Sequence, residues 1–307
     1  MKLNQLRAAL TVAEKGSLRA AARELGMSQP ALTHNIGALE RELGAVLFER
    51  HTHGMIATPV GEVFLRRAKV IASESRRAKE EVAQFLGSDH GEVVVCLSIV
   101  AHLVLLPMAL PLFQQRFPYV RLRVIEGSFP AVEARLRDGS VDFFIGPAPD
   151  ASPSREFVLD QLFDNTRAVY ARRGHPLVNA RSLAELTGAN WITTGATDDA
   201  EAQFVEVFSR NQLPAPRVVA QAESMLTMLM MLMSSDSLAI SLRQYNEFPL
   251  TRSVLQVVEV KEKLPAPRVV IIRRTALPLT PAAEFLADMF RRASAGYVAA
   301  KPSEGPR

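Results

Sequence analysis

Apolar residues in the first 43 positions recur every three or four residues in three consecutive segments. This spacing predicts three short helices, because residues three and four apart share one face of a helix. We expect the helices over residues 1–15, 17–25 and 28–43. They would enclose a small core whose apolar stripes are Leu3, Leu6, Leu10, Ala13, Leu18, Ala21, Ala22, Leu25, Leu32, Ile36, Leu39 and Leu43.

Serine, glycine and proline mark the ends of these helices. Ser17 and Ser28 are expected N-caps, since a serine hydroxyl accepts a hydrogen bond from a free amide of the first turn. Gly16 ends the first helix, and Gly26 allows a tight turn between the second and the third. Pro30 fits the first turn of the third helix, where its missing N–H costs little. Two short helices joined in this way are typical of a helix-turn-helix, whose second helix enters the major groove of DNA.

The third helix presents a small, polar face opposite its apolar stripe. Gln29 can bond adenine, Thr33 can meet a base or a thymine methyl group, and the helix N-terminus attracts phosphate. Two amphipathic helices with a glycine turn occur in many proteins, so the spacing alone favours DNA binding only weakly. The candidate DNA contacts on this helix are Ser28, Gln29, Pro30, Thr33 and His34.

Residues 49–61, ERHTHGMIATPVG, are rich in turn formers and predict a wing beside the DNA groove. In a wing, Arg50, His51 and His53 would face the phosphate backbone. The histidines lack the cysteine and acidic partners that a closed zinc site usually adds, so a solvated loop is favoured over a metal centre. We therefore expect neither a metal nor a cofactor.

Residues 61–86 form a long helical pattern with apolar or small residues at alternating spacings of four and three. A single helix can bury such a heptad seam only against a second helix, so the pattern predicts a dimer. A dimer carries two DNA-reading helices, which predicts a DNA site with two half-sites. The seam is Phe64, Ala68, Ile71, Ser75, Ala78, Val82 and Phe85.

The composition changes at GSDHG, residues 87–91, which we interpret as a hinge. Beyond it, strand-like runs alternate with helix-like stretches, which is the organisation of an α/β domain. Strands are expected at residues 92–99, 120–126, 141–145, 157–163, 167–172, 191–194, 217–223, 237–241, 255–260 and 268–273. Helices are expected at residues 102–117, 129–137, 198–211 and 224–234.

Charge and hydropathy are compatible with a globular DNA-binding protein. The formal net charge is +4, and residues 1–91 hold 13 Lys and Arg against 10 Asp and Glu, so most of the basic excess is N-terminal. The start of the chain has no export signal, and no run approaches a membrane span, so we expect a cytoplasmic protein without membrane contact. The single cysteine, Cys96, lies in the apolar run VVVCL and is expected in the core.

The stretch SLRAAARELGMSQPALTHNIGALERELGAVLFER, followed by ATPVGE, resembles the N-terminal signature of the LysR-type transcriptional regulators. The resemblance implies an N-terminal all-α winged helix-turn-helix with a long linker helix, and a C-terminal α/β effector domain of two subdomains, similar to periplasmic binding proteins. The expected division is a DNA-binding domain at 1–60, a linker and dimerisation helix at 61–86, a hinge at 87–91, subdomain I at 92–163 and 266–298, subdomain II at 164–265, and a disordered tail at 299–307.

Partners also follow from this resemblance. It implies binding to double-stranded promoter DNA, a small-molecule effector in the cleft between the subdomains, and a homotetramer built from dimers, with RNA polymerase as a further candidate partner. The stretch RFPYVRLRVIEGSFPAVEARLRDGSVDF further resembles regulators of aromatic sulfonate and aromatic acid degradation. This favours a small anionic effector, with an aromatic one as the narrower hypothesis.

The cleft residues follow from the resemblance together with a rule for open α/β sheets, in which ligands bind at the carboxyl ends of strands near helix N-termini. Hydroxyls at such positions suit a carboxylate or sulfonate. Each serine or threonine taken singly is equally well explained as a helix cap, so the cluster carries the prediction. The candidate effector contacts are Ser98, Ile99, Ala101, Gly127, Ser128, Phe129, Gly146, Pro147, Thr193, Thr194, Glu223 and Ser224.

Five methionines crowd into the helix expected at 224–234: Met225, Met228, Met230, Met231 and Met233. Methionine can line an adaptable ligand pocket. A helix that is apolar on nearly all sides is more often core or an oligomer interface, and we favour that interpretation.

Two other classes of protein fit the sequence less well. An enzyme is disfavoured because the chain has no GxGxxG, HExxH, CxxC or GxSxG motif and no phosphate-cradling loop, which leaves no candidate catalytic residue. A solute-binding or small-molecule-binding protein without DNA function would fit the C-terminal two-thirds but leaves the N-terminal helices unexplained. A gel mobility shift with the DNA upstream of the gene separates these alternatives from a regulator.

Overall fold

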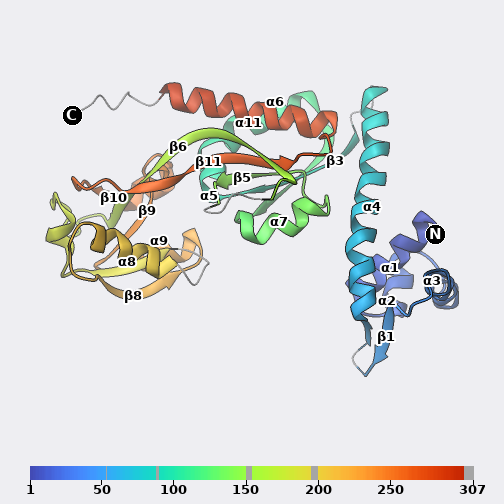
Figure 1. Ribbon diagram of the computed structural model, residues 1–307. Coiled ribbons are helices and arrows are strands. Elements are labelled where there is room, and N and C mark those ends of the chain that lie inside the picture. Colours follow the sequence, from blue (N-terminus) through green and yellow to red (C-terminus); the bar gives the residue numbers. More distant parts are fainter. Residues whose placement is uncertain (53, 88–89, 150–153, 195–199, 301–307) are drawn as a thin grey trace.

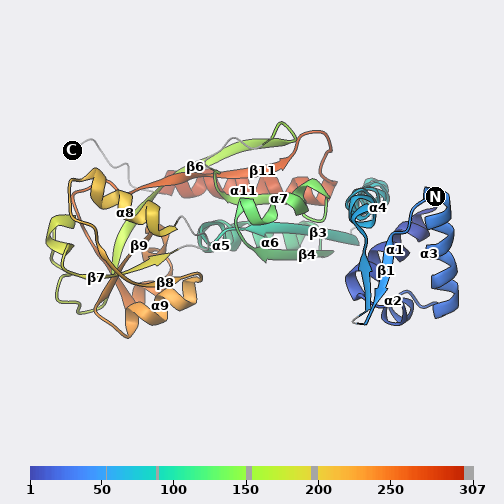
Figure 2. The ribbon, with the colours of Figure 1, turned by 60° about the horizontal axis from the view of Figure 1, so that its bottom comes forward.

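The computed structural model describes residues 1–52, 54–87, 90–149, 154–194 and 200–300. The chain forms first a small N-terminal domain, then the long helix α4, and then an elongated α/β domain with two lobes (Figure 1). In both views α4 stands between the N-terminal domain and the first lobe (Figures 1 and 2).

In the described part of residues 1–57, the N-terminal domain consists of three helices and a two-stranded wing. The elements are α1 (Leu3–Lys15), α2 (Leu18–Glu24), α3 (Gln29–Leu43), β1 (Phe48–His51) and β2 (Gly54–Ala57).

The predicted caps and turns of this domain are confirmed. The hydroxyl of Ser17 accepts a hydrogen bond from the Ala20 amide at 3.4 Å, and that of Ser28 accepts one from Ala31 at 3.3 Å. Gly16 ends α1 with a φ of +60°, and Gly26 follows α2 with a φ of +64°. Glycine enters this left-handed region without steric strain, which is why the chain turns at these two positions.

The buried stripes differ from the prediction at the ends of the helices. Leu32 is fully buried, as expected, but Leu3 and Leu43 are exposed because they occupy the first and last positions of α1 and α3. Val12, rather than Ala13, completes the buried face of α1.

Helix α4 (Pro59–Phe85) begins in the N-terminal domain and runs out of it over 27 residues. A Cβ atom at Gly61 would lie 2.1 Å from the carbonyl oxygen of Leu47, so only glycine permits this approach. Leu65 is buried in the N-terminal core, and Phe64 packs against that core. The first residue of the predicted seam, Phe64, is therefore already covered by the N-terminal domain of the same chain.

Further along α4 the seam lies open in the single chain. Ile71, Val82 and Phe85 are 43%, 61% and 87% exposed. These apolar side chains share one stripe of the helix and are exposed to solvent, and a second helix packed along the stripe would bury them.

Within the described residues, the α/β domain is built on a nine-stranded sheet in the order β4-β3-β5-β11-β6-β9-β7-β8, with β10 paired to β6. Strands β6 (Phe157–Arg172) and β11 (Pro265–Arg274) run antiparallel and pass from one lobe to the other (Figure 1). The first lobe further contains β3 (His90–Leu97), α5 (Ile99–Val104), α6 (Leu106–Arg116), β4 (Tyr119–Glu126), α7 (Phe129–Arg137), β5 (Phe143–Pro147) and α11 (Pro281–Ala300).

The second lobe is built around the other end of the sheet (Figure 2). It contains the short 3₁₀ helices η1 (Leu183–Leu186) and η2 (Arg243–Asn246), strands β7 (Asn190–Thr194), β8 (Arg217–Ala222), β9 (Ser237–Leu242) and β10 (Leu255–Val258), and helices α8 (Ala200–Arg210), α9 (Met225–Met233) and α10 (Pro249–Val254). Separate apolar cores fill the two lobes, which lets the lobes act as distinct bodies joined by β6 and β11.

Several predicted boundaries need correction. The strands expected at 157–163 and 167–172 are one strand, β6, because the polar residues Asn165 and Thr166 still pair with β11, next to a bulge at Asp164. Two helices replace the single helix expected at 102–117. The first, α5, starts earlier than expected, at Ile99, and the second, α6, follows after a break at Leu105, ahead of Pro107.

The ends of the α/β domain also differ from the prediction. Strand β3 already includes His90 and Gly91, so the expected hinge at 87–91 is shorter, and residues 88–89 of it lie outside the described residues. Helix α11, for which no helix was predicted, continues to Ala300. The rest of the expected tail, 301–307, lies outside the described residues. Among the residues described, no helix combines the length and apolar character needed to cross a bilayer.

Candidate DNA-reading helix and effector cavity

The predicted DNA-reading face of α3 lies on the surface. Ser28, Gln29, Pro30, Thr33 and His34 are all exposed. The hydroxyl of Thr33 donates a hydrogen bond to the carbonyl oxygen of Gln29 at 2.9 Å, so in the free protein it remains available as an acceptor. The Ser28 hydroxyl accepts the capping hydrogen bond at the start of α3, so helix structure alone explains a serine at this position.

The wing brings a basic residue to the surface of the N-terminal domain. Arg50 lies on β1 opposite Met55 and is exposed. His51 lies 3.5 Å from the carboxylate of Glu49, which competes with any phosphate contact. His53 lies outside the described residues. No group of three or more potential metal ligands occurs among the residues that the structure describes.

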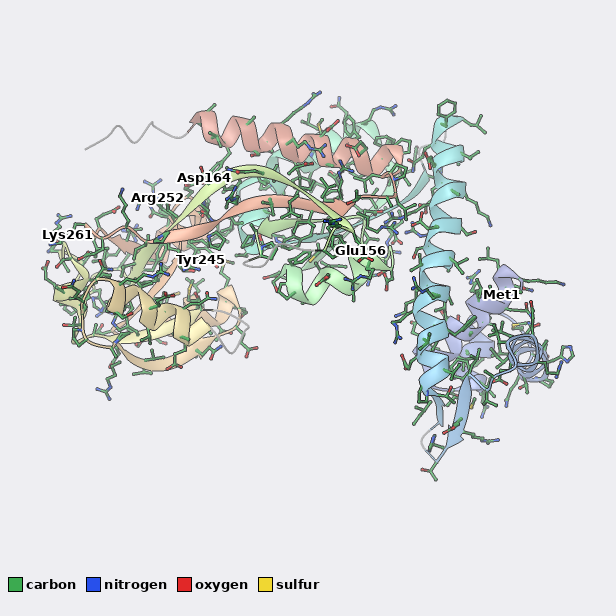
Figure 3. The ribbon with its side chains drawn as sticks, viewed as in Figure 1. Met1, Glu156, Asp164, Tyr245, Arg252 and Lys261 are labelled. Carbon is green, nitrogen blue, oxygen red and sulfur yellow. The ribbon has the colours of Figure 1, made fainter. Side chains whose placement is uncertain are left out.

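A cavity of about 450 Å³ opens where the two lobes meet. Tyr245, which is labelled in Figure 3 near the junction of the lobes, is part of its wall. The cavity lies at the carboxyl ends of β3, β4 and β5 from the first lobe and of β7 and β8 from the second. Eight of the predicted residues line it: Ser98, Ile99, Gly127, Ser128, Pro147, Thr194, Glu223 and Ser224.

Four predicted residues do not reach the cavity. Ala101 belongs to the core of the first lobe, and Phe129 packs edge-on against Phe157 in a second cluster. Thr193 is buried, because neighbouring side chains of a strand point to opposite faces and Thr194 takes the cavity side. Gly146 lies behind the wall.

Gly146 makes room for a cavity residue instead of lining the cavity itself. A Cβ atom at this position would lie 2.8 Å from the Cβ of Ser98 and 2.4 Å from the Phe144 ring. Any side chain there would displace Ser98.

Ser98 is the most unusual polar group of the cavity. It is 8% exposed, and its hydroxyl has no hydrogen-bond partner among the described residues. The residue stands at the N-cap position of α5, yet its side chain makes no capping bond. Its backbone is held by Ile145, whose carbonyl oxygen accepts from the Ser98 amide at 2.8 Å. A buried hydroxyl gains from a hydrogen-bond partner, and this one is free to bond a group that enters the cavity.

Two other serines that line the cavity stand at helix N-termini. Ser128 precedes α7 and makes no capping bond, whereas the Ser224 hydroxyl accepts from the Thr227 amide at 3.1 Å and caps α9. The N-termini of α7 and α9 thus reach the cavity from opposite lobes, and their free amides favour a negative charge between them.

Sequence reasoning missed Arg167 and Tyr245 because it considered only strand ends and the helix starts that follow them. Arg167 comes from the middle of β6, where the strand crosses between lobes, and Tyr245 comes from η2. A lone arginine at the start of the apolar run 168–171 was the signal that could have identified Arg167. The further missed residues are Glu126, Ala131, Ala222, Met225, Met228, Ser241 and Leu242.

The methionine helix has more than one role. Met228 is buried and lines the cavity, and Met225 lines it as well, while Met230 and Met233 are exposed. The interpretation as core or interface was therefore incomplete, since the same helix also forms part of the cavity wall.

The charges around the cavity are mixed. Arg167 contributes a guanidinium, while Glu126 and Glu223 contribute carboxylates from exposed positions. Burial raises the pKa of Tyr245 to about 12, so its phenol stays neutral and keeps its proton for hydrogen bonding. The cavity can therefore offer donors to an acid group and acceptors to a hydroxyl or amino group of the same ligand.

These features define a class of protein: a DNA-binding regulator with an N-terminal helix-turn-helix domain and a two-lobed α/β domain. A family model described as "Bacterial regulatory helix-turn-helix protein, lysR family" matches residues 3–62, and one described as "LysR substrate binding domain" matches residues 86–295. The chain belongs to the LysR family of DNA-binding transcriptional regulators.

Relatives with assigned names are regulators. The chain is 29% identical to the HTH-type transcriptional regulator GbpR of Azospirillum brasilense, over 79% of this chain and 72% of the relative. It is 28% identical to CbbR of Xanthobacter flavus, over 99% and 92%. These relatives are consistent with a protein that is not an enzyme.

Solved structures agree in fold. Full-length OxyR from Pseudomonas aeruginosa superposes with a TM-score of 0.71 at 25% identity, covering 95% of each chain. CbnR complexed with its target DNA gives a TM-score of 0.69 at 21% identity, covering 95% of this chain and all of that one.

Proposed function

We propose that this regulator responds to a small anionic effector bound in the cavity between the lobes. The observation that carries the proposal is the buried, unpartnered hydroxyl of Ser98. It shares the cavity with the guanidinium of Arg167 and the N-termini of α7 and α9. A carboxylate or sulfonate would accept hydrogen bonds from all of these groups. An aromatic acid is the narrower form of the proposal, supported by the apolar side chains of Ile99, Met225 and Met228 on the wall.

DNA binding is proposed to use the exposed face of α3. Gln29 and Thr33 would read bases, Pro30 and His34 would border the groove, and the amides at Ser28 would meet phosphate. Arg50 on the wing would add a phosphate contact, and His53 is retained as a candidate from the sequence alone.

Assembly is proposed to proceed through α4, whose exposed apolar stripe would pair with the same stripe of a second copy. A tetramer through the α/β domains, promoter DNA as the partner and contact with RNA polymerase complete the proposal. We propose the domain division 1–60, 61–86, 92–163 with 266–298, and 164–265, supported by the course of α4, β6 and β11.

A thermal-shift screen tests the effector proposal. Small carboxylates and sulfonates, including benzoate and benzenesulfonate, would be added to the parent and to the Ser98→Ala/Ser128→Ala variant. A ligand at about 100 times its Kd stabilises the folded state by about 2.7 kcal/mol, and the variant should show a smaller shift. Ser209→Ala on α8, outside the cavity, is the matched control. An unchanged shift in the double variant would remove these serines from the site.

The operator test is separate from the ligand test. DNase footprinting on the DNA upstream of the gene, with and without the ligand found, should show a ligand-dependent change in the parent. The Ser98→Ala/Ser128→Ala variant should keep the ligand-free footprint and lose the change. Chemical conversion of the ligand by the purified protein would contradict the proposal.

A further inference from the structure

Four charged side chains meet where α4 contacts the first lobe. Arg77 of α4 forms an ion pair with Asp142, whose Oδ1 lies 2.7 Å from Arg77 Nη2. Arg274, the last residue of β11, donates to Glu74 Oε1 of α4 at 2.6 Å. The two pairs are linked, because Arg77 Nη1 lies 3.8 Å from the same Glu74 oxygen. We call these four residues the junction cluster.

Three of the four residues are buried although the cluster lies between two parts of the chain, and Glu74 is half-buried. Arg77 and Asp142 are 4% and 3% exposed. Asp142 is clamped to β3, since its Oδ2 accepts from the Val94 amide at 2.7 Å and its own amide donates to the Val94 carbonyl at 2.7 Å. Arg77 also donates to the carbonyl oxygen of Gly139 at 3.2 Å. Every strong contact of Arg77 outside α4 is therefore made with the first lobe.

Stability alone is a weak reason for this arrangement. Desolvation of two buried ions offsets most of their attraction, and an apolar contact of similar volume often stabilises a fold as well. What an ion pair adds is direction, because the guanidinium bonds its acceptors at defined angles. The backbone comes close at the same place: Gly139 has a φ of +75°, and a Cβ atom there would lie 3.1 Å from Ser73 Cβ of α4.

The cluster and the effector cavity lie at opposite ends of the same strands. Asp142 immediately precedes β5, and β5 ends at Pro147 in the cavity wall. Val94 lies in β3, which ends directly before Ser98. At about 3.3 Å per residue, the two ends are roughly 15 Å apart. Figure 1 shows the same geometry, with the near ends of β3 and β11 facing the side of α4.

We propose that the junction cluster locks α4 to the first lobe as one rigid unit, with Arg77 as the positioning residue. A displacement of the cavity ends of β3 and β5 then moves α4 as well, and α4 transmits the movement to the DNA-reading helices. The delivery of a ligand signal rests on the proposed effector function, whereas the rigid junction itself does not. A few residues between α4 and β3 would otherwise act as a free hinge.

Distance measurement by pulsed electron spin resonance tests the lock. Nitroxide labels at Lys69→Cys on α4 and Ala295→Cys on α11 report the junction, and labels at Gln115→Cys and Ala295→Cys report the first lobe alone. Both sites of each pair are exposed, while the native Cys96 is buried. Labelled protein is diluted with unlabelled protein, so that distances within one chain dominate.

The test variant is Arg77→Met/Asp142→Asn, which leaves no unpaired charge in the buried site and preserves an acceptor for the Val94 amide. A single Arg77→Met substitution would bury an unpaired carboxylate and risks unfolding. The control is Arg76→Met, whose ion pair with Glu80 at 2.7 Å stays within α4.

We expect a narrow distribution of distances between the labels on α4 and α11 in the parent and in Arg76→Met. In the double variant this distribution should be about twofold broader, because the contact between α4 and the first lobe is locally released. The distribution within the first lobe should not change in any variant. A purely structural role for Arg77 would lower the melting temperature without broadening the junction alone. A junction distribution of parental width in the folded double variant would overturn the proposal. If no acid binds the parent while its junction is narrow, the effector proposal fails and the lock stands.

Discussion

At the scale of single residues, the same residue type at the same kind of position has different functions. Ser98, Ser128 and Ser224 all precede helices, but only Ser224 uses its hydroxyl as a cap. The difference is set by the surroundings, since Ser98 is enclosed by the strands beside it. The hydrogen bonds of the three hydroxyls therefore distinguish Ser98 and Ser128 from a helix cap, whereas a cap rule alone would assign all three to structure.

Arg167 should contribute more to acid binding than either serine. Both groups would bond a charged acid, but the guanidinium brings a full opposite charge and can donate two parallel hydrogen bonds, whereas a serine hydroxyl donates one. We expect Arg167→Met to weaken binding of the effector acid by about tenfold or more relative to Ser98→Ala, measured by calorimetry. Arg243→Met, on η2 next to the cavity, is the control. Equal losses in the Arg167 and Ser98 variants would place the acid group elsewhere in the cavity.

Cys96 should be chemically inert in the folded protein. Burial raises the pKa of its thiol to about 11, so at pH 8 only about one molecule in a thousand carries the reactive thiolate. We expect reaction with Ellman's reagent to be at least about 100-fold slower in the native protein than in denaturant. Rapid labelling of the native protein would show that β3 opens, which would also argue against a rigid first lobe.

At the scale of elements, α3 and α4 each divide their surfaces between packing and function. α3 buries Leu32, Ile36 and Leu39 and presents its start to solvent. α4 buries Leu65 in one domain and Arg77 against another, and it leaves Ile71, Val82 and Phe85 of its apolar stripe open. Each helix therefore acts as a connector whose faces serve different partners.

Gln29→Ala and Thr33→Ala should weaken specific DNA binding without unfolding the protein. Each good base contact contributes about 1–3 kcal/mol, so a loss of roughly tenfold per substitution is expected in fluorescence anisotropy with the operator. Thr11→Ala is the matched control, because Thr11 donates to the carbonyl of Arg7 at 2.9 Å as Thr33 does to Gln29, but on α1. Parental affinity in both test variants would refute the assignment of the reading face.

At the scale of the whole molecule, DNA reading, assembly and ligand binding follow one another along the chain. Coupling between the ends is a difference in effector affinity between assembly states, typically about 1–3 kcal/mol. Such a difference requires a connected path, and α4 with the junction cluster supplies one between the cavity and the N-terminal domain.

Ile71→Asp should abolish the dimer. The side chain is exposed in the single chain, so the charge is tolerated in the monomer but would be buried in a helix pair at a cost of several kcal/mol. Light scattering should show half the parental mass or less at equal concentration. Phe64→Asp tests something different, because Phe64 packs on the N-terminal core and its loss should also lower that domain's stability. Parental mass for Ile71→Asp would contradict the heptad interpretation.

The sequence by itself determined the local features of this protein. Helical spacing, two serine caps and a glycine turn specify α1 to α3, because these signals depend on residues three or four positions apart. The alternation of apolar strands and helices likewise predicted the α/β class. Tertiary structure decided what depends on distant residues: the continuity of β6 through polar positions, the arrival of Arg167 and Tyr245 in the cavity, and the burial of Arg77 against Asp142. Residues 65 positions apart along the chain leave no periodic signal, since their proximity arises only when the sheet and α4 pack together.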